Sequence, residues 1–182
     1  MKKEFKFKEG EVLLFNKPLH WTSFQLVNKV RWLIKRELGV KKIKVGHAGT
    51  LDPLANGLLI LCTGKMTKEI DQFQAAEKEY IATIKLGATT PSYDGEMVED
   101  RFYATKHINE DLIKTTLQTF TGEIQQYPPM FSALKVGGKK LYEIARKGNE
   151  VAVKPRAITI SGLEILELDM PYIKLRVTCS KG

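Results

Sequence analysis

One acidic side chain, Asp52, stands among glycines in the segment 46–57, which reads GHAGTLDPLANG. Glycine allows backbone angles that other residues resist, and Pro53 fixes the backbone just after the acid and favours an extended conformation at Asp52. We therefore expect neither a regular helix nor a regular strand over 46–57, but a loop from which the carboxylate projects. The apolar run at 58–62 predicts a buried strand that anchors this loop.

A single carboxylate in such a loop suits a nucleophile. An aspartate is already ionised at neutral pH, so it needs no separate base to activate it. The sequence shows no obvious partner acid for Asp52, which argues against the paired-acid chemistry of ordinary glycosidases. The alternative is a turn residue whose side chain bonds its own backbone, as is common before proline.

Two further residues could contact a substrate. Tyr80 stands at the head of a predicted strand, where it is either a core aromatic or a ring that stacks on a base. His47 is either a structural hydrogen-bonding group or a contact to RNA. The histidines and cysteines lack the spacing of metal ligands, and the run 64–67 (GKMT) does not complete a phosphate-binding loop. We expect no metal and no cofactor.

The chain is strongly basic, with 29 Lys and Arg against 21 Asp and Glu and a formal net charge of +8. Such an excess favours a polyanionic partner, nucleic acid above all. The basic residues gather just before the Asp52 loop, just after it, and in a later segment. They are Lys41, Lys42, Lys44, Lys65, Lys68, Lys135, Lys139, Lys140, Arg146 and Lys147.

Hydrophobic patterns predict irregularly alternating strands and helices in one domain over 1–182. We expect a mixed α/β fold of α+β character, with a largely antiparallel sheet flanked by helices. The predicted strands cover 11–17, 57–62, 79–86, 156–168 and 172–179, and the predicted helices cover about 23–38, 67–76, 110–121 and 140–147.

Caps and stripes define the two longer helices. Thr22 or Ser23 can cap the first helix, which Gly39 ends, and Asn109 can cap the helix that ends at Gly122. The expected inner stripes are Phe24, Val27, Val30, Ile34 and Leu38 in the first helix, and Leu112, Ile113, Leu117 and Phe120 in the second.

Residues 123–154 are less regular and strongly basic. They contain Pro128, Pro129 and a Gly137-Gly138 turn, which together predict an arm inserted into the domain. Basic insertions of this kind often close over a ligand.

Cys62 and Cys179 lie far apart within apolar segments, which predicts two reduced thiols in a cytoplasmic protein. We expect no secretory leader, and no apolar run approaches the roughly 20 residues that span a bilayer. A membrane location is therefore not expected.

The segment 46–59 (GHAGTLDPLANGLL) closely resembles the catalytic segment of the bacterial tRNA pseudouridine synthase B (TruB) family. The resemblance covers residues 11–182 in order. It includes 16–18 with 22–23 as the first segment of the family, 78–80 as its tyrosine segment, 127–148 as its RNA-gripping thumb, and 179–182 as the start of its final catalytic strand.

This resemblance implies a pseudouridine synthase fold and an isomerase that converts uridine 55 in the TΨC loop of tRNA. The enzyme would use no metal or cofactor and would act on the T-arm as a monomer, without a protein partner. Asp52 would be the nucleophile, Tyr80 would pack against the target base and could assist proton removal, and His47 would fill the space that the flipped base leaves. The expected phosphate contacts are Lys17, Lys68, Lys135, Lys139, Lys140 and Arg146.

The resemblance also implies that Gly182 falls before a Tyr, an Arg and a small C-terminal RNA-binding domain of the family. We therefore expect an incomplete catalytic domain without that C-terminal domain, and activity that is weak or absent. Two alternatives stay open. One is a noncatalytic RNA-binding module or tRNA chaperone, and the other is a synthase that works on guide-RNA complexes, for which the sequence suggests no docking surface.

Overall fold

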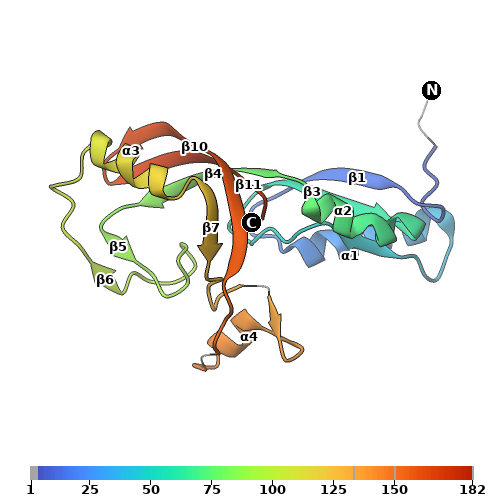
Figure 1. Ribbon diagram of the computed structural model, residues 1–182. Helices are drawn as coiled ribbons and strands as arrows, with labels where there is room; N and C mark the ends of the chain where they lie inside the picture. Colours follow the sequence, from blue (N-terminus) through green and yellow to red (C-terminus); the bar gives the residue numbers. More distant parts are fainter. Residues whose placement is uncertain (1–3, 133, 150, 182) are drawn as a thin grey trace. The chain divides into compact units, whose positions relative to one another are not determined.

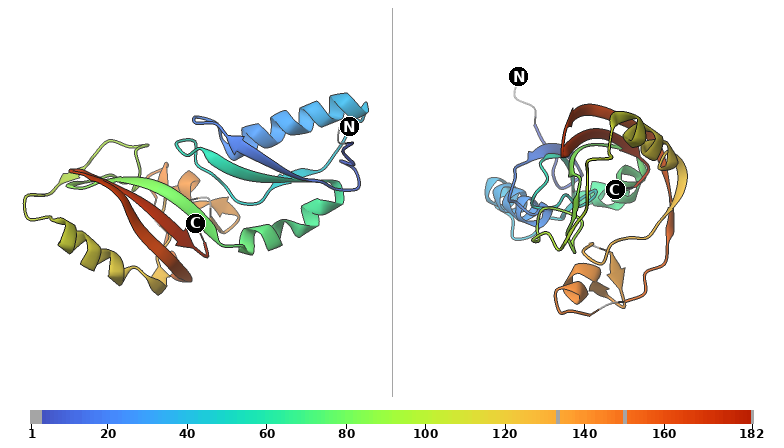
Figure 2. Two further views of the ribbon diagram at one scale, coloured as in Figure 1. Left: turned by 90° about the horizontal axis from the view of Figure 1, so that it is seen from above. Right: turned by 90° about the vertical axis from the view of Figure 1, so that its left-hand side faces the viewer.

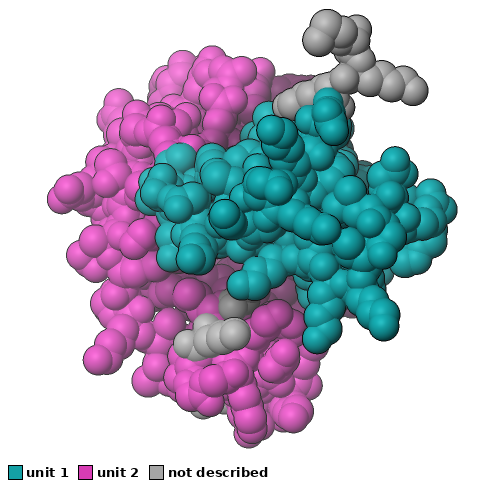
Figure 3. All heavy atoms as spheres, turned by 90° about the vertical axis from the view of Figure 1, so that its right-hand side faces the viewer, with its two compact units in different colours: residues 1–76 teal, residues 77–182 magenta. Residues whose placement is uncertain are grey.

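The computed structural model describes residues 4–132, 134–149 and 151–181. Its contacts divide the chain into two compact units, Met1–Ala76 and Glu77–Gly182, which are coloured separately in Figure 3. Both units combine helices with antiparallel sheets, so the predicted α+β class is confirmed. The expected single domain stays a prediction.

The first unit is built on a three-stranded antiparallel sheet in the order β1-β3-β2. Helix α1 lies along one face of this sheet and α2 along the other (Figures 1 and 2). The strands predicted at 11–17 and 57–62 are confirmed. The elements are β1 (Val12–Lys17), α1 (Ser23–Leu38), β2 (Val45–His47), β3 (Gly57–Thr63), the 3-10 helix η1 (Gly64–Glu69) and α2 (Ile70–Ala75).

Helix α1 begins and ends where its sequence signals predict. The Thr22 hydroxyl accepts a hydrogen bond from the backbone N–H of Gln25 at 3.1 Å, while the Gln25 side chain accepts from the Thr22 N–H at 2.7 Å. This capping box satisfies two N–H groups that the helix itself leaves unbonded. Gly39 ends the helix in the left-handed conformation with φ 60°.

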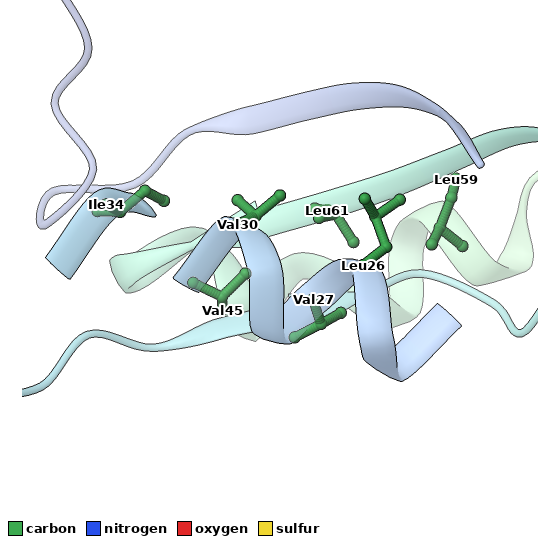
Figure 4. Packing of buried hydrophobic residues seen from close by; sticks show 7 residues of the cluster. All are labelled: Leu26, Val27, Val30, Ile34, Val45, Leu59 and Leu61. Carbon is green, nitrogen blue, oxygen red and sulfur yellow. The ribbon is translucent and has the colours of Figure 1, made fainter. Parts of the chain in front are cut away.

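The buried face of α1 packs on β2 and β3. Figure 4 shows the apolar side chains of the helix and of the two strands turned toward one another. Phe24 and Leu38, which we expected in this stripe, are instead 60% and 37% exposed. Phe24 lies one position off the buried set and thus about 100° around the helix, and Leu38 is the last helical residue. The core of this unit contains Leu26, Val27, Val30, Ile34, Val45, Leu59 and Leu61.

The second unit is built on a four-stranded antiparallel sheet in the order β4-β11-β10-β7. The strands predicted at 79–86, 156–168 and 172–179 are confirmed. The elements are β4 (Lys78–Lys85), β5 (Ala88–Thr89), β6 (Arg101–Phe102), α3 (Glu110–Thr119), β7 (Gly122–Gln126), β8 (Lys135–Val136), β9 (Lys139–Lys140), α4 (Leu141–Ala145), β10 (Arg156–Asp169) and β11 (Tyr172–Cys179).

Helix α3 covers one face of this sheet. Ile113 packs with Ile173 and Leu175 of β11, and Leu117 packs against the same cluster. The predicted cap is confirmed, because the Asn109 side chain accepts from the N–H of residue 112 at 2.9 Å. The predicted stripe was too wide. Leu112 is 42% exposed, because it lies one position and thus about 100° around the helix from Ile113. Phe120 is 50% exposed, because it follows Thr119, the last helical residue.

The basic arm starts later than expected. Residues 122–126 form β7, which pairs with β10 from Arg156 to Ile160, so they belong to the sheet. Beyond β7, the strands β8 and β9 form a hairpin around the predicted Gly137-Gly138 turn, and α4 follows directly. The arm therefore begins after Gln126.

Cys62 and Cys179 are both free and buried, as the sequence predicts. None of the helices in the described ranges is long and apolar enough to cross a bilayer.

The core position Leu61 provides a test of the first unit. Leu61 is fully buried, whereas Leu58 in the same strand is 63% exposed. Leu61→Ala should lower the free energy of unfolding by about 2–5 kcal/mol, because the lost burial leaves a cavity. Denaturant unfolding measures the change. Leu58→Ala is the matched control and should lie within about 1 kcal/mol of wild type; equal losses in the two variants would contradict the core described here.

Candidate functional site

Asp52 lies in the irregular segment between β2 and β3, and its side chain is exposed. The irregular part is shorter than expected, because Gly46 and His47 belong to β2 and pair with β3. The pairing is continued by the N–H of Ala48, which donates to the carbonyl of Ile60 at 2.9 Å. The loop that presents the carboxylate, here called the Asp52 loop, therefore covers residues 48–56.

Gly46 leaves room in β2 for a side chain of α2. A Cβ atom placed on Gly46 would lie 2.7 Å from Cδ1 of Ile70, the first residue of α2. Real Cβ atoms essentially never approach another heavy atom so closely. Gly46 thus lets α2 pack against the strand that leads into the Asp52 loop.

Ser23, the first residue of α1, fastens the Asp52 loop next to its acid. The Ser23 hydroxyl accepts a hydrogen bond from the N–H of Leu51 at 2.9 Å and donates to the carbonyl of the same residue at 3.1 Å. Ser23 is 2% exposed, so these bonds are shielded from water. We call this pair of hydrogen bonds the Ser23 clamp.

A second attachment holds the other side of the acid. The N–H of His20 donates to the carbonyl of Pro53 at 2.7 Å, and within the loop the N–H of Ala55 donates to the carbonyl of Asp52 at 3.0 Å. His20 has φ 64°, a conformation that non-glycine residues rarely adopt. The backbone is therefore fixed on both sides of Asp52 while its carboxylate stays exposed.

Lys17, the last residue of β1, is fully buried. Its ammonium donates to the carbonyls of Pro18 at 2.9 Å and Trp21 at 2.7 Å. Burial lowers the pKa of Lys17, and the negative charge of Asp52 acts in the opposite direction. This burial argues against the phosphate contact that we expected for Lys17 and places its positive charge at the base of the Asp52 loop instead.

His47 is half-buried at the end of β2. Its Nδ1 atom is in hydrogen-bonding contact with the carbonyl of Gly49. This contact fits the structural interpretation of His47 and orients the ring at the entry to the Asp52 loop. Its expected contact with RNA stays a prediction.

Tyr80 lies in the second unit, near the start of β4, and is half-buried. It pairs with Val177 of β11, just as Ala82 pairs with Leu175. Paired residues in neighbouring strands project on the same side of a sheet, so Tyr80 shares the face that carries Leu175.

The other expected phosphate contacts lie on η1 and in the arm. Lys68 and Lys139 are exposed. Lys140 and Arg146 lie over the ring of Tyr142, with Nζ at 5.3 Å and Cζ at 5.5 Å from its centroid. Arg146 also forms an ion pair with Glu96. The side chain of Lys135 lies outside the described residues.

Sequence reasoning missed two contributions to this site. Ser23 was considered only as a cap, and the capping role falls to Thr22, which leaves the Ser23 hydroxyl for the loop. The sequence offered one sign of this role: a serine that directly follows a residue able to cap the helix, and whose hydroxyl is therefore not needed for the cap. Lys17 was grouped with the surface cations because nothing in the sequence marks it as buried.

The geometry of the first unit suits covalent or electrostatic work by a carboxylate. The carboxylate of Asp52 is exposed to a ligand, its loop is fixed at both ends, and the buried cation Lys17 lies nearby. Among the residues that the structure describes, no three His, Cys, Asp or Glu side chains are grouped so as to hold a metal ion.

Comparison with known proteins gives one consistent result. The family model described as "TruB family pseudouridylate synthase (N terminal domain)" matches residues 35–182. The tRNA pseudouridine synthase B of Parabacteroides distasonis is 61% identical over 97% of this chain and 75% of its own length. The protein of the same name from Flavobacterium johnsoniae is 53% identical, with 97% and 77% covered.

A solved structure supports the fold. Over 97% of this chain, a chain of a crystallised Cbf5-Nop10-Gar1 complex superimposes with a TM-score of 0.65 and 27% sequence identity. The present chain spans only 41% of that longer chain.

Removing the hydroxyl of Ser23 tests the clamp. Ser23→Ala leaves the part-buried N–H and carbonyl of Leu51 without their partner, which should lower the free energy of unfolding by about 1–3 kcal/mol. Ser161→Ala removes an exposed hydroxyl of the other unit that donates to Glu77 at 2.6 Å. Because this hydrogen bond is open to water, the free energy of unfolding should change by less than about 1 kcal/mol. Urea unfolding of both variants measures the difference, and similar small changes would contradict a stabilising clamp.

The buried charge of Lys17 makes stability depend on pH. Its pKa in the folded protein lies below the ordinary value of 10.5 because of burial. Between these two pKa values the unfolded chain binds more protons, so this residue makes the protein more stable as pH rises. Wild type should therefore gain stability relative to Lys17→Met between about pH 7 and about pH 10. Denaturant unfolding of both proteins at the two pH values measures this, and a constant difference would contradict it.

Proposed function

Because this chain belongs to the TruB family of pseudouridylate synthases, we propose that it converts uridine 55 in the TΨC loop of tRNA into pseudouridine, with Asp52 as the nucleophile. The relatives named tRNA pseudouridine synthase B support tRNA as the substrate class. The observation that carries the proposal is the exposed carboxylate of Asp52 on a loop fixed by the Ser23 clamp.

The reaction is an isomerisation. The bond between C1′ of the ribose and N1 of uracil breaks, and a bond between C1′ and C5 forms. The hydrogen on C5 leaves as a proton and N1 takes up a proton, so no oxidant or reductant is consumed. Asp52 assists either by attacking the sugar or by promoting a glycal at the same ribose, and both routes require one ionised carboxylate at the reacting nucleoside.

Two features of the first unit prepare Asp52 for this role. The fixed backbone reduces the motion that must be lost when the carboxylate meets the ribose. The buried ammonium of Lys17 favours the ionised form of a nearby carboxylate. Lys17 therefore supports the nucleophile and does not itself bind RNA.

The target uridine must leave its stack to reach the carboxylate, at a free-energy cost of a few kcal/mol. We propose that Tyr80 packs against the flipped base and could assist removal of the C5 proton, and that His47 occupies the vacated space. Lys68, Lys135, Lys139, Lys140 and Arg146 then bind phosphates. RNA must compete with Glu96 for Arg146, because the two side chains form an ion pair in the structure.

We propose further that the chain acts on tRNA as a monomer in the cytoplasm, without a metal or cofactor. The solved Cbf5 chain was crystallised with Nop10 and Gar1. Nothing in the described part of the present chain identifies a surface for such partners.

A noncatalytic RNA-binding module or tRNA chaperone is the second candidate, which the basic arm and the net charge of +8 favour. The Asp52→Asn substitution separates the two. It keeps the shape of the side chain but removes its charge, so pseudouridine formation in a tRNA transcript should fall on the order of 1000-fold, equivalent to about 4 kcal/mol of transition-state stabilisation. RNA affinity should stay within about threefold of wild type, a change of less than 1 kcal/mol.

Asp71→Asn is the matched control, because Asp71 is an exposed aspartate on α2 that lies outside the Asp52 loop. It should retain wild-type turnover. Chemical mapping of pseudouridine after incubation measures both the rate and the position. Unchanged turnover in Asp52→Asn would refute the nucleophile, and pseudouridine at a position other than 55 would refute the proposed specificity.

A further inference from the structure

A hollow on the first unit is lined almost entirely by cations. It lies where α1 ends and the following connection leads into β2. Its lining consists of Arg31, Lys35, Lys41, Lys42, Ile43 and Lys44. We call it the basic hollow.

The backbone and the arginine of the basic hollow are held in place. The guanidinium of Arg31 donates to the carbonyl of Val45 and to Oδ1 of Asn28, both at 2.8 Å. The carbonyl of Lys44 accepts from the N–H of Gly64 at 3.0 Å. The side chains of Lys41, Lys42 and Lys44 are exposed, so their ammonium groups are accessible to a ligand.

These charges have no counter-charge in the described structure. None of the five cations forms an ion pair with a carboxylate of a described residue. Lys35 lies in the last turn of α1, where the negative end of the helix dipole stabilises a positive charge. The remaining four repel one another, and an anion bound among them would relieve this repulsion.

We propose that the basic hollow binds backbone phosphates of the RNA, at a site separate from the Asp52 loop. Ser23 touches the Asp52 loop at one end of α1, and Lys35 lies 12 positions further along the same helix. At 1.5 Å per residue, the two positions are about 18 Å apart. Lysines on flexible stems suit phosphates of any sequence, because they act as point charges and do not distinguish base edges. This inference rests on the proposed function, which identifies the RNA as tRNA. It assigns the hollow to phosphates of nucleotides other than the uridine that reacts at Asp52.

The test compares two triple variants that lose the same charge. The first removes three cations of the hollow, and the second removes three exposed lysines of the other unit. They are Lys35→Gln with Lys41→Gln and Lys42→Gln, and Lys106→Gln with Lys114→Gln and Lys174→Gln.

The probe is unmodified full-length tRNA transcript, and the dissociation constant is measured at several salt concentrations. The hollow variant should bind roughly tenfold more weakly than wild type, and its salt slope should fall by about 0.7–0.9 for each lost phosphate contact. The control variant should stay within about twofold of wild type. The control variant should also keep wild-type turnover, because it changes neither the hollow nor the Asp52 loop, and circular dichroism checks that both variants fold.

Equal affinities and salt slopes in the two variants would overturn the proposal. The same result is expected if the hollow binds an acidic protein and not RNA. The binding measurement does not depend on turnover, so it tests the hollow separately from the proposed pseudouridine formation. A wild type that binds tRNA but forms no pseudouridine contradicts the proposed conversion by this chain, agrees with the absent activity that the sequence allows, and still tests the hollow. A wild type that does not bind tRNA overturns both.

Discussion

Two hydrogen bonds between the side chain of Ser23 and the backbone of Leu51 hold the Asp52 loop. The Ser23 hydroxyl both accepts from and donates to Leu51, directly before Asp52. Ser23 can do so only because α1 packs its apolar face on β2 and β3 and because Thr22 supplies the helix cap. The hydrophobic core thus determines where the acid lies.

The buried Lys17 shows how this unit tolerates a charge in its interior. An isolated buried ammonium is strongly unfavourable unless it is paired or hydrogen-bonded. Here two carbonyls accept hydrogen bonds from the ammonium, and the carboxylate of Asp52 supplies an opposite charge. The same arrangement serves the exposed acid, since a positive charge behind the loop favours the ionised form that a nucleophile requires.

Much of the fold could be predicted, because it depends on local signals. The Thr22 and Asn109 caps, the Gly39 stop and the long strands of the second unit are written in residue type and spacing. The errors arose where packing between elements decides. Phe24 fits a helical repeat yet faces solvent, and 122–126 looked irregular but becomes a strand because β10 offers a partner.

The candidate site could be predicted in part. The glycines and the proline mark a loop whose lone carboxylate suits a nucleophile, and the residue types allow Tyr80 and His47 to contact a nucleic acid. The reaction itself, and the detailed roles of these residues toward a flipped uridine, come from a family resemblance. The clamp could not be predicted, since it joins residues 28 positions apart in the sequence. The burial of Lys17 likewise depends on how the turn after β1 folds back over its ammonium.

Amide hydrogen exchange at Leu51, followed by nuclear magnetic resonance, tests the central claim most directly. If the Ser23 clamp fixes the Asp52 loop, the Leu51 amide should exchange as slowly as the amides of β3, because it can open only when α1 leaves the sheet. Exchange at the rate of an unstructured peptide would show that the loop is not held, and the account of a positioned nucleophile would be contradicted.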